Sequence, residues 1–190
     1  MSRFATVSVF LSIVFGLLTG CRSARPESDP ECLRWRALVD PNVEYSRQED
    51  ALSKSGPAQD LFAISPDLRD VSVLSDDEVL SAIRCLLSFQ GERGEARYWG
   101  ATDIRSSAIT GPCDIEVAAL YYVSYLFTGD WIHGTNVALI DRRGHVNDAA
   151  DIRTAFRAYR RWFATVEKIG LNRARKDGLD PLEGSGVHWY

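Results

Sequence analysis

Five acidic and imidazole side chains in the second half of the chain have types and spacing that could do chemistry. Asp130, His133, Asp141, His145 and Asp148 follow one another closely in the sequence. Carboxylates beside imidazoles hold divalent metals or transfer protons. From Asp141 onward, however, cationic side chains stand where an EF-hand loop would place oxygen ligands. Surface turns and helix caps use the same residue types, and we favour that interpretation.

Glu116 is the second candidate for chemistry. It stands inside an apolar stretch, and an acid enclosed by apolar side chains is a typical proton donor. A hydrolase of envelope polymers is therefore one hypothesis. The chain has no His-Glu-x-x-His helix, no Gly-x-Ser-x-Gly elbow and no glycine loop that would cradle a phosphate. Neither a metal nor another cofactor is indicated, and the sequence favours a protein that is not an enzyme.

A third group of residues is suited to contact with a partner. The connection from 92 to 111 is longer than compact domains usually carry, and it interleaves arginines with aromatic side chains. The alternative to contact with a partner is that the aromatic side chains of this connection fold back onto the core. The candidate contact residues of the whole chain are Arg97, Tyr98, Trp99, Trp131, His133 and His145.

A central helix must position these groups. Residues 115–127 are apolar except for Glu116 and Ser124, so a helix made from them would be buried on all sides. Such a helix would be about 20 Å long, whereas a membrane span needs about 30 Å. We therefore expect a core helix and not a membrane-spanning one.

The remaining signals predict a mainly α fold, a single helical-bundle-like domain over 30–190. Ser75 and Glu78 form a capping box ahead of a helix at 76–89. Asn147 is expected to cap a helix that runs to Ile169, and the stretch 137–147 predicts a small β-hairpin. Other short helices are expected at 30–39, 44–53 and 171–176, and the C-terminal Trp-Tyr is expected to dock on the body.

Basic side chains lie outside the apolar stripe of the 147–169 helix. They are Arg153, Arg157, Arg160, Arg161 and Lys168. A solvated surface explains them most simply, and contact with anionic headgroups or an acidic protein is the alternative. The chain has a formal net charge of −4, which argues against binding to nucleic acid.

The N-terminus has the composition of an export signal. Arg3 precedes an apolar run that extends from Phe4 to Leu18. The four residues that end this region are Leu18, Thr19, Gly20 and Cys21, and they resemble the lipobox of bacterial lipoproteins. The resemblance covers residues 1–21 and does not extend to the domain.

Several expectations follow from the resemblance to lipoproteins. It implies that residues 1–20 are removed, that Cys21 receives acyl chains such as palmitate, and that residues 21–29 tether the domain to a membrane. An ordinary cleaved signal or an uncleaved anchor helix is the alternative. Arg22 occupies the position where aspartate would retain a lipoprotein at the inner membrane. The outer membrane is therefore the expected site, with the domain facing the periplasm.

Export would permit a disulfide bond. Cys32, Cys85 and Cys113 remain beyond the lipid-bearing cysteine, so at most one bridge forms and one thiol stays free. The sequence leaves the pairing open.

These observations favour a membrane-anchored, protein-binding lipoprotein, such as an inhibitor, an immunity-like protein or an envelope scaffold. A hydrolase or a small-ligand carrier of the envelope is the alternative. If the chain is such a hydrolase or carrier, its catalytic or binding site would lie near Glu116 or the cluster Asp130, His133, Asp141 and His145.

Overall fold

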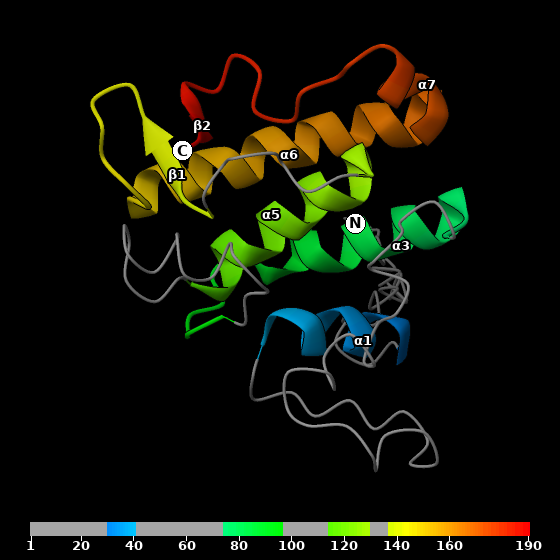
Figure 1. Ribbon diagram of the computed structural model, residues 1–190, viewed down its shortest axis with the longest axis horizontal. Helices are drawn as coiled ribbons and strands as arrows, with labels where there is room; N and C mark the ends of the chain where they lie inside the picture. Colours follow the sequence, from blue (N-terminus) through cyan, green and yellow to red (C-terminus); the bar gives the residue numbers. More distant parts are fainter. Residues whose placement is uncertain (1–29, 41–73, 97–113, 130–136) are drawn as a thin grey trace, which may run out of the picture.

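The structure is a computed structural model that describes residues 30–40, 74–96, 114–129 and 137–190. In these ranges the fold is mainly α with one small antiparallel sheet (Figure 1). The elements in chain order are α1 Pro30–Val39, α3 Asp76–Leu86, η4 Leu87–Phe89, α5 Ile115–Thr128, β1 Leu139–Asp141, α6 Ala149–Ile169, α7 Leu171–Lys176 and β2 Val187–Trp189. The predicted polar helix at 44–53 lies outside the described residues.

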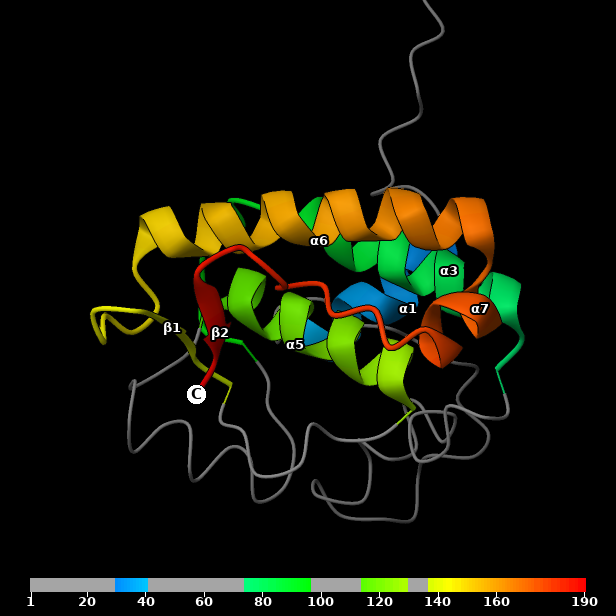
Figure 2. The same cartoon turned by 90° about the horizontal axis from the view of Figure 1, so that it is seen from above.

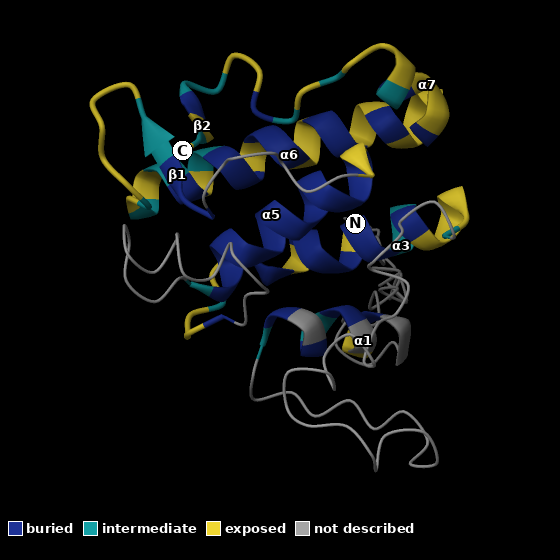
Figure 3. Ribbon diagram, in the orientation of Figure 1, coloured by how far each residue is buried: buried dark blue, intermediate teal, exposed yellow. Residues whose placement is uncertain are grey.

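Helix α5 occupies the centre of the fold, as its sequence predicts. Every residue from Ile115 to Phe127 is buried, and Figure 3 shows the helix dark blue along nearly its whole length. Gly129 ends the helix in a left-handed conformation (φ 74°) that glycine adopts without steric cost. None of the helices in the described ranges is both long enough and apolar enough to cross a membrane.

The other helices surround α5. Helix α1 packs on α3 and α5, and α6 and α7 lie on the side of α5 away from α1 (Figure 1). Helix α3 begins with the predicted capping box: the Ser75 hydroxyl accepts from the amide of Glu78, whose carboxylate accepts from the Ser75 amide. The predicted 76–89 helix tightens into the 3-10 turn η4 for its last three residues.

The sheet differs from a simple local hairpin. The predicted return near 137–147 is present as a bridge between Ile140 and Val146. The paired strand, however, is β2, antiparallel to β1 with Leu139 opposite Trp189. The C-terminus therefore docks on the body as predicted, and it does so by adding a strand.

Asn147 does not cap α6, which corrects the sequence-based prediction. Its backbone is left-handed (φ 51°), and its side-chain oxygen accepts from the Leu139 amide at 2.8 Å. Asp148 caps the helix instead, accepting from the Ala150 amide at 2.7 Å. The one-residue shift arises because Asn147 is needed to close the turn that returns from β1.

Candidate functional site

The Asp141 carboxylate organises the turn after β1. One of its oxygens accepts from the amides of Arg143 and His145, each at 2.8 Å, and the other lies 3.1 Å from His145 Nδ1. Burial would raise the pKa of Asp141, but the hydrogen bonds from His145 and Arg143 outweigh it and hold the pKa below its usual value. Asp141 and His145 thus contact each other within a surface turn, which is the interpretation that the sequence favoured.

The rest of the predicted acid and imidazole cluster does not form a metal centre in the described part of the chain. Asp148 is used as the cap of α6, and Asp130 and His133 lie outside the described residues. Burial and repulsion from Asp141 and Asp148 raise the pKa of Asp151. No three carboxylate, imidazole or thiol groups in the described ranges are placed to hold a metal ion.

Glu116 is buried, as predicted, and it binds the loop that follows η4. Its side chain is 3% exposed, and Oε2 accepts from the Gly91 amide at 2.8 Å. Oε1 lies 3.2 Å from Nη1 of Arg93, an ion-pair distance without hydrogen-bond geometry. The same Arg93 nitrogen lies 2.7 Å from Asp114. Glu116 is therefore compensated by an amide and a guanidinium, which is the arrangement of an anchor between α5 and the preceding loop.

Most of the predicted contact residues lie outside the described residues. This holds for Arg97, Tyr98, Trp99, Trp131 and His133, whereas His145 is described and exposed. The large exposed apolar side chains in the described part come from separate segments of the chain: Leu33, Val146, Ile169 and Tyr190.

A cavity that the sequence did not reveal opens beside the C-terminal end of α5. Its volume is about 500 Å³, within the range of small-molecule sites. The lining comes from α5, α7 and the C-terminal segment, which Figure 2 shows passing from α7 to β2 alongside α5 and α6. The lining residues are Ser124, Phe127, Thr128, Arg175, Gly178, Leu179, Asp180, Pro181 and Trp189. We refer to this cavity as the α5/α7 pocket.

A chain of hydrogen bonds runs through the wall of the α5/α7 pocket. Trp189 Nε1 donates to the hydroxyl of Tyr159 at 3.0 Å. Ser124 Oγ donates its single proton to the carbonyl of Leu120. Its hydrogen bond with Tyr159 therefore uses the Tyr159 proton, so the phenol donates to Ser124 Oγ.

Each hydrogen bond in this series has a defined donor and acceptor. Burial raises the pKa of Tyr159, and the hydrogen bonds with Ser124 and Trp189 offset this only in part, so the phenol is neutral near pH 7. Ser124 donates to a carbonyl, and a carbonyl is not a general base. The arrangement suits a rigid binding wall better than a nucleophile.

The basic residues of α6 form one exposed surface. Arg153, Arg157, Arg160 and Arg161 are exposed together with Lys168, and the apolar stripe of the helix faces α5. Figure 3 shows the exposed residues along the outer side of α6. We call these five residues the α6 basic face.

The charges of the α6 basic face are only partly compensated. Arg160 donates to the Leu87 carbonyl at 3.1 Å, and Arg157 donates to Thr154 on its own helix at 2.9 Å. At the edge of the face, Glu167 pairs with Arg84 of α3 at 2.6 Å. In the described ranges no carboxylate forms an ion pair with Arg153, Arg157 or Arg161.

Comparison of the chain with family models, with curated proteins and with solved structures gives no match. The geometry of the described residues is therefore the basis for a proposal about function.

Proposed function

We propose that this chain is a lipid-anchored lipoprotein of the bacterial envelope whose domain binds an acidic protein through the α6 basic face. The observation that supports the proposal is a row of arginines on α6 that form no ion pair with any carboxylate in the part of the chain that the structure describes. Arg153, Arg157 and Arg161 recur every four residues, which places like charges next to one another on one helix face. Each such neighbouring pair destabilises a helix by about 0.2–0.5 kcal/mol, so the arrangement favours a partner that neutralises it.

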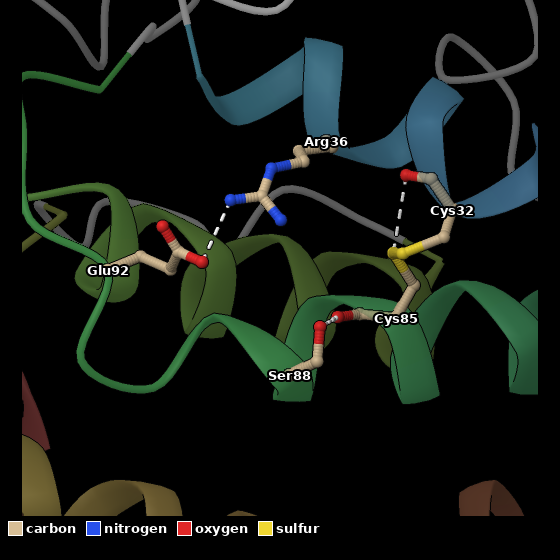
Figure 4. The surroundings of a disulfide bond; sticks show 5 residues. All are labelled: Cys32, Arg36, Cys85, Ser88 and Glu92. Carbon is tan, nitrogen blue, oxygen red and sulfur yellow. Dashed lines mark hydrogen bonds and ion pairs between the residues drawn. A yellow bond between two sulfur atoms is a disulfide. The ribbon is translucent and has the colours of Figure 1, made fainter. Parts of the chain in front are cut away.

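The disulfide bond supports export of the domain. Cys32 of α1 and Cys85 of α3 are bonded, with 5.4 Å between their Cα atoms (Figure 4). Structural disulfides persist in oxidising compartments such as the periplasm and are rare in the cytosol. Together with the lipobox-like residues that end at Cys21, the bond favours a domain facing the periplasm, at the outer membrane.

The position of α1 favours a protein partner over lipid headgroups. The sequence from Cys21 leads directly into α1, and α1 packs on α3 and α5. Helix α6 lies on the other side of α5 (Figure 1). With α1 next to the membrane, the α6 basic face would point into the periplasm, where an envelope protein with a complementary acidic surface could reach it.

The anchor is tested by substitution of Cys21. We expect Cys21→Ser to abolish the incorporation of labelled palmitate and to leave the precursor uncleaved or the domain released from membranes, because the thiol is the acceptor of the first lipid. Membrane fractionation and labelling measure both effects. Cys113→Ser is the control and should fractionate like the unaltered chain. Equal labelling of the Cys21→Ser variant would exclude lipidation at this residue.

The basic face is tested by crosslinking in intact cells. A photo-crosslinking residue at Ala164, which is exposed within the face, should capture an acidic envelope protein. Combining Arg153→Gln, Arg157→Gln and Arg161→Gln should lower the yield about tenfold, because complementary charges govern the encounter of two proteins.

The matched control removes three exposed cations elsewhere, from Arg142, Arg143 and Lys176, and should leave the crosslinking yield unchanged. If only lipid is crosslinked, the α6 basic face binds anionic headgroups and not a protein, which would contradict the proposal. A yield that falls equally in both triple variants would mean that only net charge matters and would contradict a specific face.

A further inference from the structure

The α5/α7 pocket contains a half-buried cation that forms no ion pair with a carboxylate of the described residues. Arg175 lies in α7, and its guanidinium donates to the carbonyls of Phe127 at 2.7 Å and Leu126 at 2.9 Å. Both carbonyls belong to the last turn of α5, where unpaired carbonyls and the negative end of the helix dipole favour a cation. These two bonds hold the guanidinium in place and use two of its five N–H donors.

Four arginines in the described ranges form ion pairs with carboxylates at 2.6–3.2 Å, namely Arg36, Arg84, Arg93 and Arg173. Arg175 has none within the part of the chain that the structure describes. Burial lowers the pKa of Arg175, and the charge of Asp76 offsets this only in part. A cation placed this way is stabilised by any anion that enters the pocket, and the low-dielectric walls strengthen the interaction.

The remaining walls of the pocket are largely apolar. Phe127, Leu179, Pro181 and Trp189 line it, and the Trp189 ring is itself fixed edge-on to Tyr121 with 5.4 Å between the ring centroids. The carboxylate of Asp180 also lines the pocket, where one oxygen accepts from the Leu182 amide at 2.8 Å. The pocket therefore combines a positioned guanidinium with rigid aromatic and aliphatic walls.

We propose that the α5/α7 pocket is a binding site for a small amphipathic carboxylate, with the carboxylate on Arg175 and the apolar body against Phe127, Leu179 and Trp189. A planar guanidinium suits a carboxylate because two of its donors can point to the two oxygens. This site is separate from the α6 basic face and does not depend on the proposed protein partner.

Three probes that share one body test the role of charge. They are 3-phenylpropionate, 3-phenylpropanol and 3-phenylpropylamine, titrated by calorimetry into the full chain held in neutral phosphatidylcholine nanodiscs. The propionate should bind about ten- to a hundredfold more tightly than the alcohol, as expected for hydrogen bonds to a charged group. Equal affinity for all three, no binding at all, or a preference for the amine through Asp180 would overturn the proposal.

Two variants locate the effect in the pocket. Arg175→Gln should abolish the preference for the propionate, whereas Arg173→Gln, two residues away and paired with Asp177 outside the pocket, should retain it. Because Arg175 also caps α5, its loss could disturb folding. Thr128→Phe fills the pocket from its rim and leaves Arg175 in place, so it should abolish binding of all three probes without lowering the melting temperature. Full binding by this variant would place the site elsewhere and contradict the proposal.

Discussion

Replacing both Cys32 and Cys85 by serine should lower the free energy of unfolding by about 4 kcal/mol. The two cysteines are separated by 53 residues, and the bond between them restricts the unfolded chain over that whole length. The chain-entropy relation for a loop of this size gives the stated value. Urea denaturation of the double variant, followed by circular dichroism, measures the loss as a shift of the midpoint.

The control for this prediction is reduction of the unaltered bond. The chain in excess reductant should lose the same free energy as the double variant, and the variant itself should not respond to reductant. Cys113→Ser serves as the background for both measurements, since it removes the thiol that could exchange with the disulfide. If reduction leaves the stability of the Cys113→Ser chain unchanged, the bond between α1 and α3 does not stabilise the fold.

The contacts around the bond suggest where its loss would act first. Trp35 and Val39 of α1 are buried against the core, and Arg36 forms an ion pair with Glu92 at 2.8 Å (Figure 4). The Arg36 guanidinium also lies 5.1 Å from the ring centroid of Phe89. Because the disulfide joins α1 to α3, α1 is the element whose attachment to the rest of the fold its loss would weaken directly. Limited proteolysis within α1 should accelerate in the double variant.

The helices could be predicted because their signals are local. The capping box of Ser75 and Glu78, the apolar stripe of α6 and the unbroken apolar run of α5 each lie within a few turns of sequence. Periodicity and capping depend on neighbours at most four residues apart, so a single sequence contains them. The same reasoning predicted that Glu116 is buried and favoured a surface turn for Asp141 and His145.

The features that sequence reasoning missed depend on distant partners. Leu139 pairs with Trp189, and Cys32 with Cys85, and neither pairing leaves a local pattern. Three cysteines allow several pairings, and spacing does not choose among them. The α5/α7 pocket is missed for the same reason, since Ser124, Arg175 and Trp189 come from three separate segments. An arginine in a short polar helix carries no sign that it caps another helix.

Leu120→Ala should lower the free energy of unfolding by about 3 kcal/mol, because the side chain is fully buried and its removal leaves a cavity. Leu120 lies midway along α5, and the helix is enclosed by neighbours from α3, η4 and α6. The surrounding side chains therefore have little freedom to fill the gap. Thermal and urea denaturation of the variant at pH 7 give the change directly.

The matched control is the same substitution at Leu33 of α1, which is 39% exposed. Leu33→Ala removes the same atoms from a site that is already partly solvated, so it should cost less than about 1 kcal/mol. The difference between the two leucines measures how completely α5 is enclosed. Equal losses would mean that α5 is no better shielded than the surface of α1, and the pocket beside its C-terminal end would then lack the rigid wall on which binding of a carboxylate depends.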